Sequence, residues 1–181
     1  MIIDYYDNIL ITSNNNPSEL YQISTNNINN IINSGNENDK MTASNIVTSL
    51  TNASTTLGYN TGVIDPTGTY AYVATQNVTN TSLTINKINL SDLPPASVAS
   101  YTISTTAGVD SYVSLMDPSG NYVYFITYVT SGTGFLYKLP ISTFGTSTNV
   151  TSYSSTSLLN IKSGVITSDG SYAILFLVLH F

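Results

Sequence analysis

The sequence predicts an all-β fold of repeated four-stranded antiparallel units, and three observations lead to that prediction. A nine-residue phrase, DPTGTYAYV at 65–73, returns as DPSGNYVYF at 117–125 and more loosely as TSDGSYAIL at 167–175. Each copy joins a turn to a run of tyrosine and β-branched or aliphatic residues, which favours a strand. The glycines of the three copies are 52 and 50 residues apart. The chain therefore repeats with a period of about 50 residues.

The turn in each phrase is specified by its own residues. Asp65 can accept hydrogen bonds from the backbone that follows it, Pro66 fixes a φ torsion that suits a type I turn, and Gly68 relieves crowding at the exit. The second copy has the same residue types at Asp117, Pro118 and Gly120. In the third copy Thr-Ser replaces Asp-Pro, and we expect the pair Asp169–Gly170 to supply the turn chemistry instead.

The runs that follow the turns, at 70–73, 122–130 and 172–178, are predicted to be strands covered on both faces. A strand with one solvent-exposed face should alternate apolar and polar residues, and these runs do not. A buried helical segment would also explain continuous apolarity. The preceding turn, the short length and the β-branched and aromatic content favour the strand.

The remaining strands of each unit follow from the same period. First strands are predicted before the turns at 62–64, 112–116 and 164–166, third strands at 82–93 and 135–144, and fourth strands at 100–105 and 151–156. Lys87 and Lys138 fall at equivalent positions of the third strand. We expect both lysines to extend over the edge of a sheet rather than to bind an anion.

Upstream of the first turn, the pattern predicts a second strand at 9–13, a third at 19–25 and a fourth at 46–51, so that the chain starts and stops in mid-unit. We expect a single domain over 1–181, made of a partial unit 1–61 with an Asn-rich insertion at 26–40, repeats 62–108 and 109–161, and a partial repeat 162–181.

Repeated antiparallel units that need cover on both faces describe the blades of a β-propeller. The segment YAYVATQNVTNTSLTINKINL at 70–90 is similar to a YVTN-type propeller repeat. The resemblance covers 62–93 and 112–144, and part of 164–178. It implies a β-propeller-like array of about three blade equivalents that forms an incomplete ring within one chain. It also implies that the first strand of each repeat lies near a central axis.

Composition restricts the partners and the setting of this chain. Of its 181 residues, 41% are hydrophobic and only 8% are charged, with four lysines, no arginine and a net charge of −6. Nucleic acids and anionic membrane surfaces require clustered cations, so neither is an expected partner. Asn, Ser and Thr take the surface positions that charged residues usually occupy. This pattern indicates an extracellular or cell-surface protein.

Targeting and membrane segments are not predicted. The opening MIIDYYDNILIT has neither a basic region nor an uninterrupted apolar stretch, so it does not resemble a signal peptide. The terminal AILFLVLHF, at 173–181, is too short to span a bilayer alone, although it could begin a longer span. We expect a buried strand there. The chain has no cysteine, which excludes disulfides and thiolate sites.

No catalytic group, cofactor or metal site is predicted. The single histidine, His180, ends a hydrophobic strand with no acid or nucleophile placed near it, and a serine nucleophile would need a base. Turn geometry explains Asp65, Asp117 and Asp169 without calcium. The acidic stretch at 36–39 lacks the ligand spacing of a calcium loop.

Asn-x-Ser/Thr sequons are the one chemical motif that recurs. They occur at Asn52, Asn77, Asn80, Asn89 and Asn149. We expect Asn77, Asn80 and Asn149 to lie in loops, where glycans would be tolerated.

The sequence as a whole predicts an extracellular, non-enzymatic structural or adhesive scaffold. Its apolar segment 173–179 would be an aggregation-prone edge, so we expect it to pair with another copy, in an oligomer or filament, or with further blades of a longer chain. The alternative is a fragment of a lactonase-like propeller enzyme, as the family resemblance allows, or of a ligand-binding ectodomain whose site lies outside this chain.

Overall fold

The computed structural model describes residues 2–3, 8–12, 19–24, 46–51, 57–77, 81–91, 96–104, 109–129, 132–146 and 150–177. These residues form antiparallel strands and their connections, together with one short 3-10 helix, η3 (Thr156–Leu158). The predicted all-β class is confirmed for this part of the chain.

The strands form three sheets of four strands and one hairpin, each in chain order. The first sheet contains β1 (Ile2–Ile3), β2 (Asn8–Thr12), β3 (Glu19–Ser24) and β4 (Ile46–Thr51). The second sheet contains β5 (Leu57–Ile64), β6 (Tyr70–Asn77), β7 (Ser82–Asn89) and β8 (Ala96–Ser104). The third sheet contains β9 (Val109–Met116), β10 (Tyr122–Val129), β11 (Thr133–Pro140) and β12 (Thr151–Ser155). The hairpin contains β13 (Ile161–Ile166) and β14 (Ala173–Leu177).

The predicted start in mid-unit is wrong. Strand β1 pairs with β2 through Ile2↔Leu10 and Ile3↔Ile9, so the first sheet has a first strand of its own. Two residues are too short to show a strand pattern, which is why the sequence did not reveal it. The other first strands are also longer than predicted, since β5 begins at Leu57 rather than at residue 62.

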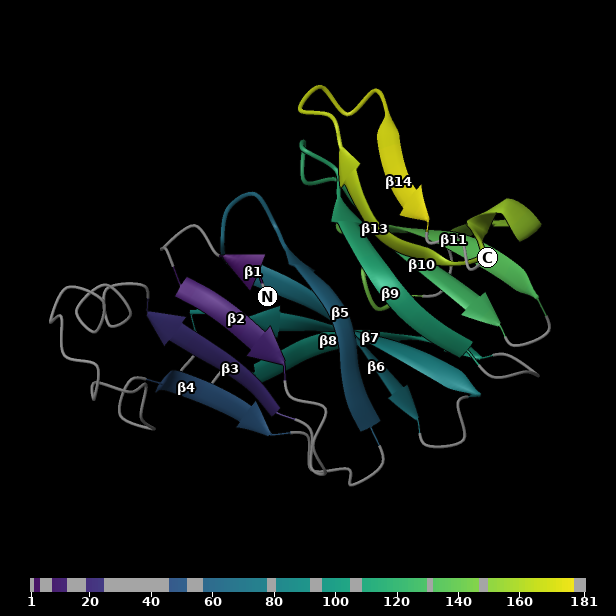
Figure 1. Cartoon of the computed structure of the whole chain (residues 1–181). Coiled ribbons are helices and arrows are strands. Elements are labelled where there is room, and N and C mark those ends of the chain that lie inside the picture. The colour runs from purple at the N-terminus through teal and green to yellow at the C-terminus, as the bar shows by residue number, and fades with distance from the viewer. Residues whose placement is uncertain are drawn as a thin grey trace, which may run out of the picture.

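Successive sheets meet along their first strands, as Figure 1 shows. Strand β1 lies against β5, β5 against β9, and β9 against β13, while the later strands of each sheet fan outward. This arrangement is blade-like. In the part of the chain that the structure describes, the sheets follow one another without closing a ring.

The second strand of the second sheet, β6, is covered on both faces, as predicted. All residues of β6 from Ala71 to Thr75 are buried. We call the face toward the following sheet the leading face, with Tyr72 and Ala74 in β6, and the opposite face the trailing face. The leading face of the second sheet packs on Val123 and Phe125, which lie on the trailing face of the third sheet. A continuous core therefore joins these two sheets.

The turn that enters β6 has the predicted type I pattern. The Gly68 N–H donates to the Asp65 carbonyl at 2.9 Å, and the Asp65 carboxylate accepts the Tyr70 N–H at 2.9 Å. The turn that enters β10 repeats the backbone bonds. Its glycine, Gly120, has φ of +71°, and a Cβ placed there would lie 3.3 Å from Cδ of Pro66. Consecutive turns therefore pack on one another.

In the turn that enters β14, the acidic residue and the hydroxyl residue have swapped positions relative to the first copy. In the first copy the Thr67 hydroxyl donates to Asp65, whereas in the third the Thr167 hydroxyl donates to Asp169 at 2.5 Å and accepts the Tyr172 N–H at 3.1 Å. Hydrogen bonds from Thr167 and from the backbone and hydroxyl of Ser171 lower the pKa of Asp169 to about 2. The predicted role of the pair Asp169–Gly170 is confirmed.

Candidate strand-pairing site

Strand β14 is the second strand of its unit, yet it has only β13 beside it in the described residues. The equivalent strands β6 and β10 each lie between two neighbours. Equivalence follows from the turns, since Tyr70, Tyr122 and Tyr172 each accept the same backbone hydrogen bond from the first turn residue. The outer edge of β14 therefore corresponds to the edge that β7 and β11 cover in the other sheets.

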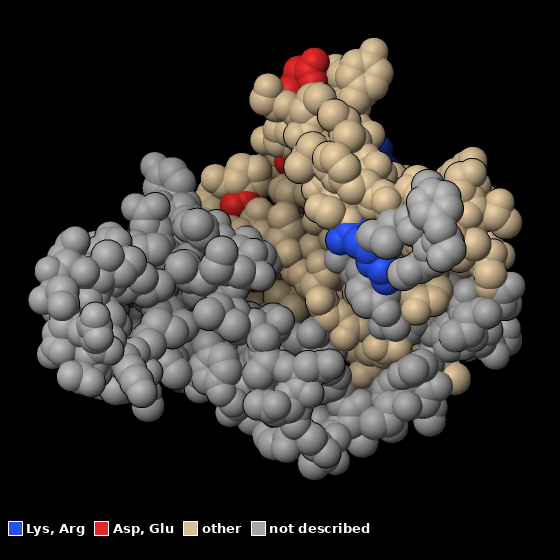
Figure 2. Space-filling model, viewed as in Figure 1, with Lys and Arg blue, Asp and Glu red and all other residues tan. Residues whose placement is uncertain are grey.

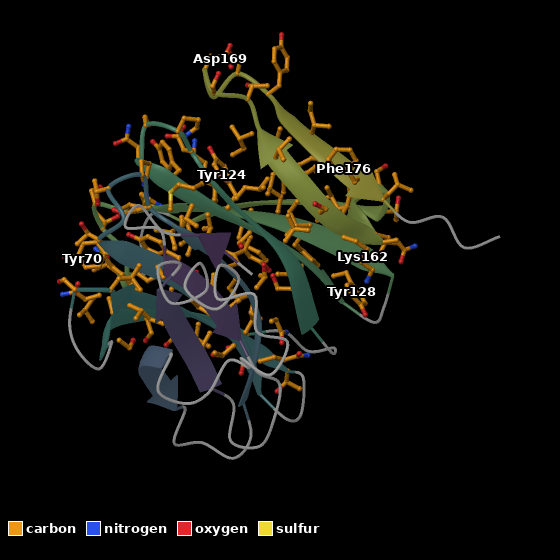
Figure 3. The ribbon with its side chains drawn as sticks, turned by 60° about the vertical axis from the view of Figure 1, so that its left-hand side comes forward. Tyr70, Tyr124, Tyr128, Lys162, Asp169 and Phe176 are labelled. Carbon is orange, nitrogen blue, oxygen red and sulfur yellow. The ribbon has the colours of Figure 1, made fainter. Side chains whose placement is uncertain are left out.

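The leading face of the hairpin is apolar and exposed. Tyr172 is 73% exposed, Phe176 54%, and Ile174 and Val165 50% each. Figure 3 shows Phe176 on this outer hairpin. The expected strand is present, but the expectation that it is buried is wrong for residues 173–177. For Ile174 and Phe176 the reason is that no following sheet covers this face within the described residues.

The trailing face of the hairpin packs on the third sheet. Ile161 is buried, and Ile166 and Leu175 contact the cluster formed by Leu115 and Ile126. These apolar contacts with the third sheet, and not the turn alone, fix the position of β14.

A cavity of about 190 Å³ lies between the hairpin and the third sheet. Tyr124, Ile126 and Leu136 line one side, and Ile166, Ala173 and Leu175 line the other, next to the turn at 170–172. Figure 3 shows Tyr124 on the third sheet below the hairpin.

The corresponding position between the second and third sheets is filled. There the ring of Phe144, which follows β11, meets Tyr72 edge-on at 5.0 Å. Tyr72 is fully buried, and this burial, with the nearby Asp65 carboxylate, raises the pKa of its hydroxyl well above the ordinary value. Tyr124 is the equivalent of Tyr72, but it is only partly buried.

Lysine side chains of the third strands lie over tyrosine rings. Lys87 Nζ is 4.0 Å from the ring centroid of Tyr70, and Lys138 Nζ is 3.7 Å from that of Tyr122. These are cation–π contacts within single sheets, between neighbouring strands. Figure 2 shows that charged residues cover little of the described surface in that view.

The structure places few of the predicted modification sites. Asn89 ends β7, and its side-chain oxygen accepts hydrogen bonds from the backbone and hydroxyl of Ser91, the serine of its own sequon. Asn77 is the last residue of β6 rather than a loop residue. Outside the described residues lie Asn52, Asn80, Asn149, His180 and the stretch 36–39.

Sequence reasoning missed two features of the hairpin site, the cavity and the exposed Tyr172. The aligned tyrosines of the three phrases carried a signal for Tyr172, because they mark it as the equivalent of Tyr70 and Tyr122. The cavity had no such signal, since its walls come from strands far apart in the sequence.

The sequence matches no model of a known protein family, and no curated protein is significantly similar to it. Among the described residues, no group of three or more His, Cys, Asp or Glu side chains could hold a metal ion. The described residues also contain no helix that is both long and apolar enough to cross a membrane.

Proposed function

We propose that this protein is a non-enzymatic, extracellular structural or adhesive scaffold of β-propeller-like blades, which assembles by strand pairing at the edge of β14. Its partners in the proposal are other copies of the chain or further blades of the same repeat. The observation that carries it is the β14 edge itself, an apolar strand that has one neighbour among the described residues where its two equivalents have two.

Such an edge is costly to leave open. An unpaired strand offers its backbone N–H and C=O groups to any other strand, and natural sheets cover, charge or shorten such edges. The side chains of Ile174 and Phe176 lie on the leading face of β14, and both are about half exposed. The strand contains no charged residue. Strand addition covers the backbone and the apolar side chains together.

The test is the mass of the full chain in solution, measured by sedimentation over a range of concentrations. We expect concentration-dependent assembly, and we expect Phe176→Lys to reduce it because a charge at the edge opposes pairing. Val98→Lys is the matched control, since Val98 is also an apolar residue that is about half exposed but lies on β8 of the second sheet. A stable monomer at all concentrations would exclude self-assembly.

The extracellular part of the proposal is supported by composition and by the sequons. Glycopeptide mapping of natural material would test it at Asn52, Asn77, Asn80, Asn89 and Asn149. We expect occupancy at one or more of them if the source cell glycosylates secreted proteins. Detection of the unmodified chain in the cytoplasm alone would contradict this location.

A further inference from the structure

The repeats of this molecule show what kind of strand fits the β14 edge. We propose that β14 and the cavity beside it bind an extended polypeptide segment as a third strand, with apolar side chains on its inner face and a lysine or arginine on its outer face. This inference rests on the proposed function, because it names the chemistry of the strand that the edge receives.

The inner face of the segment is inferred from β11, which covers the edge of β10. Leu139 lies opposite Val123 and Tyr137 opposite Phe125, and all four side chains belong to or pack on the core between the second and third sheets. The hairpin repeats the first half of this arrangement, with Ala173 and Leu175 at the positions of Val123 and Phe125. A segment paired with β14 therefore needs apolar residues at alternate positions.

The cavity adds a requirement for one bulky side chain. Tyr72 is covered by the ring of Phe144, which follows the third strand of the next sheet. Tyr124 holds the equivalent position and borders the cavity of about 190 Å³ instead. An aromatic or branched aliphatic side chain just beyond the paired strand would take the place that Phe144 takes against Tyr72.

The outer face of the segment is inferred from the lysine–tyrosine contacts. Lys87 lies opposite Tyr72 and over Tyr70, and Lys138 lies opposite Tyr124 and over Tyr122. In the hairpin the equivalent ring is Tyr172, which is exposed. A cation opposite Ile174 would lie over it in the same way.

The shape of the site favours an extended segment over the edge of a second folded copy. Leu136, which lines the cavity, belongs to β11, so the third sheet continues beyond β10 beneath the outer edge of β14. Figure 1 shows these strands below the hairpin. A second folded sheet that approached β14 edge-on would collide with β11 of the third sheet, whereas a single strand can lie along β11.

The test uses the full chain and a fluorescent peptide with the sequence of residues 133–144, TGFLYKLPISTF, which has the whole inferred pattern. Binding is followed by fluorescence anisotropy. We expect saturable binding that is weakened ~10-fold or more by Phe144→Ala in the peptide, because the cavity then stays empty. A peptide N-methylated at alternate residues keeps the side chains but loses backbone donors, and it should not bind.

Two protein variants distinguish binding at this site from non-specific binding. Tyr172→Ala should weaken binding ~2–5-fold, and this loss should vanish with a peptide in which Lys138 is replaced by Met, because the cation–π contact is then already absent. Ala173→Trp should fill the cavity and abolish binding. Val98→Ala, on β8 of the second sheet, should leave binding unchanged.

The outcomes distinguish this inference from the proposed function. Binding that survives backbone methylation, or that ignores both Tyr172→Ala and Ala173→Trp, would overturn the inference. Assembly through β14 that the peptide neither joins nor displaces would assign the edge to a second copy, so the inference would fail and the scaffold would stand. Peptide binding to a chain that stays monomeric would support the inference and exclude self-assembly.

Discussion

The second and third sheets present equivalent residues to the sheet that follows them, yet these residues are buried to different degrees. Tyr72 and Ile85 of the second sheet are fully buried. Their equivalents in the third sheet, Tyr124 and Leu136, are only partly buried. The second sheet faces four strands and the ring of Phe144, whereas the third faces a hairpin of two strands. Burial is thus set by the neighbouring sheet rather than by the residue type.

The largest expected effect comes from the filled interface. Phe125→Ala removes a fully buried ring between the second and third sheets, and we expect a loss of ~3–5 kcal/mol in the free energy of unfolding. Phe176→Ala removes the same side chain from the exposed face of β14 and should cost no more than ~0.5 kcal/mol. Chemical denaturation of both variants measures the difference, and similar losses would contradict the comparison.

A finer test uses the leading faces directly. Ile85→Ala should lower the free energy of unfolding by ~2–5 kcal/mol, as expected for a fully buried aliphatic residue. Leu136→Ala should cost less, ~1–2 kcal/mol, because its side chain already borders a cavity and is partly exposed. An equal or larger loss for Leu136 in denaturant titrations would show that the hairpin covers the third sheet fully.

The contacts between consecutive turns are tested at Gly120. Its φ of +71° suits glycine, and an added Cβ would also meet Pro66 at 3.3 Å. We expect Gly120→Ala to cost ~1–2 kcal/mol, measured by thermal and chemical unfolding. Gly120→Asn shares the contact but tolerates this φ, so it separates backbone strain from packing. No loss in Gly120→Ala would count against both contributions.

A smaller effect of the opposite sign is expected at Tyr72. Its hydroxyl is buried and has no hydrogen-bond partner among the described residues, which is an unfavourable state for a polar group. Tyr72→Phe should therefore leave the free energy of unfolding unchanged or raise it by up to ~1 kcal/mol. A clear destabilisation in urea titrations would show that the hydroxyl is hydrogen-bonded in solution.

The smallest effect is a dependence on pH at the turn of the hairpin. Because the folded pKa of Asp169 is about 2, below its ordinary value of 3.8, its charge stabilises the folded state above that ordinary value. This contribution is lost as the pH falls toward 2. Urea titrations at several pH values should show it, and Asp169→Asn should lack this part of the pH dependence. Identical pH profiles for the two proteins would refute the assignment.

The turns and second strands could be predicted from the sequence because their causes are local. The bonds that Asp65 and Thr167 make reach only to Tyr70 and Tyr172, five residues away in each case. Side chains in such short loops meet with no help from the rest of the chain. The repeat then extended the same prediction along the chain. Strand β1 was not predicted because it has only two residues and is defined by its pairing with β2.

The amino-acid sequence by itself determined the turns, the period and the apolar second strands, since each depends on residues within a few positions of one another. Only the tertiary structure decided which of these strands are covered. The segments at 122–129 and 173–177 are both apolar. They differ because β10 lies between two strands and two layers, whereas β14 has one neighbour and one layer in the part of the chain that the structure describes. Burial depends on contacts between residues far apart in the chain, and neither composition nor spacing contains them.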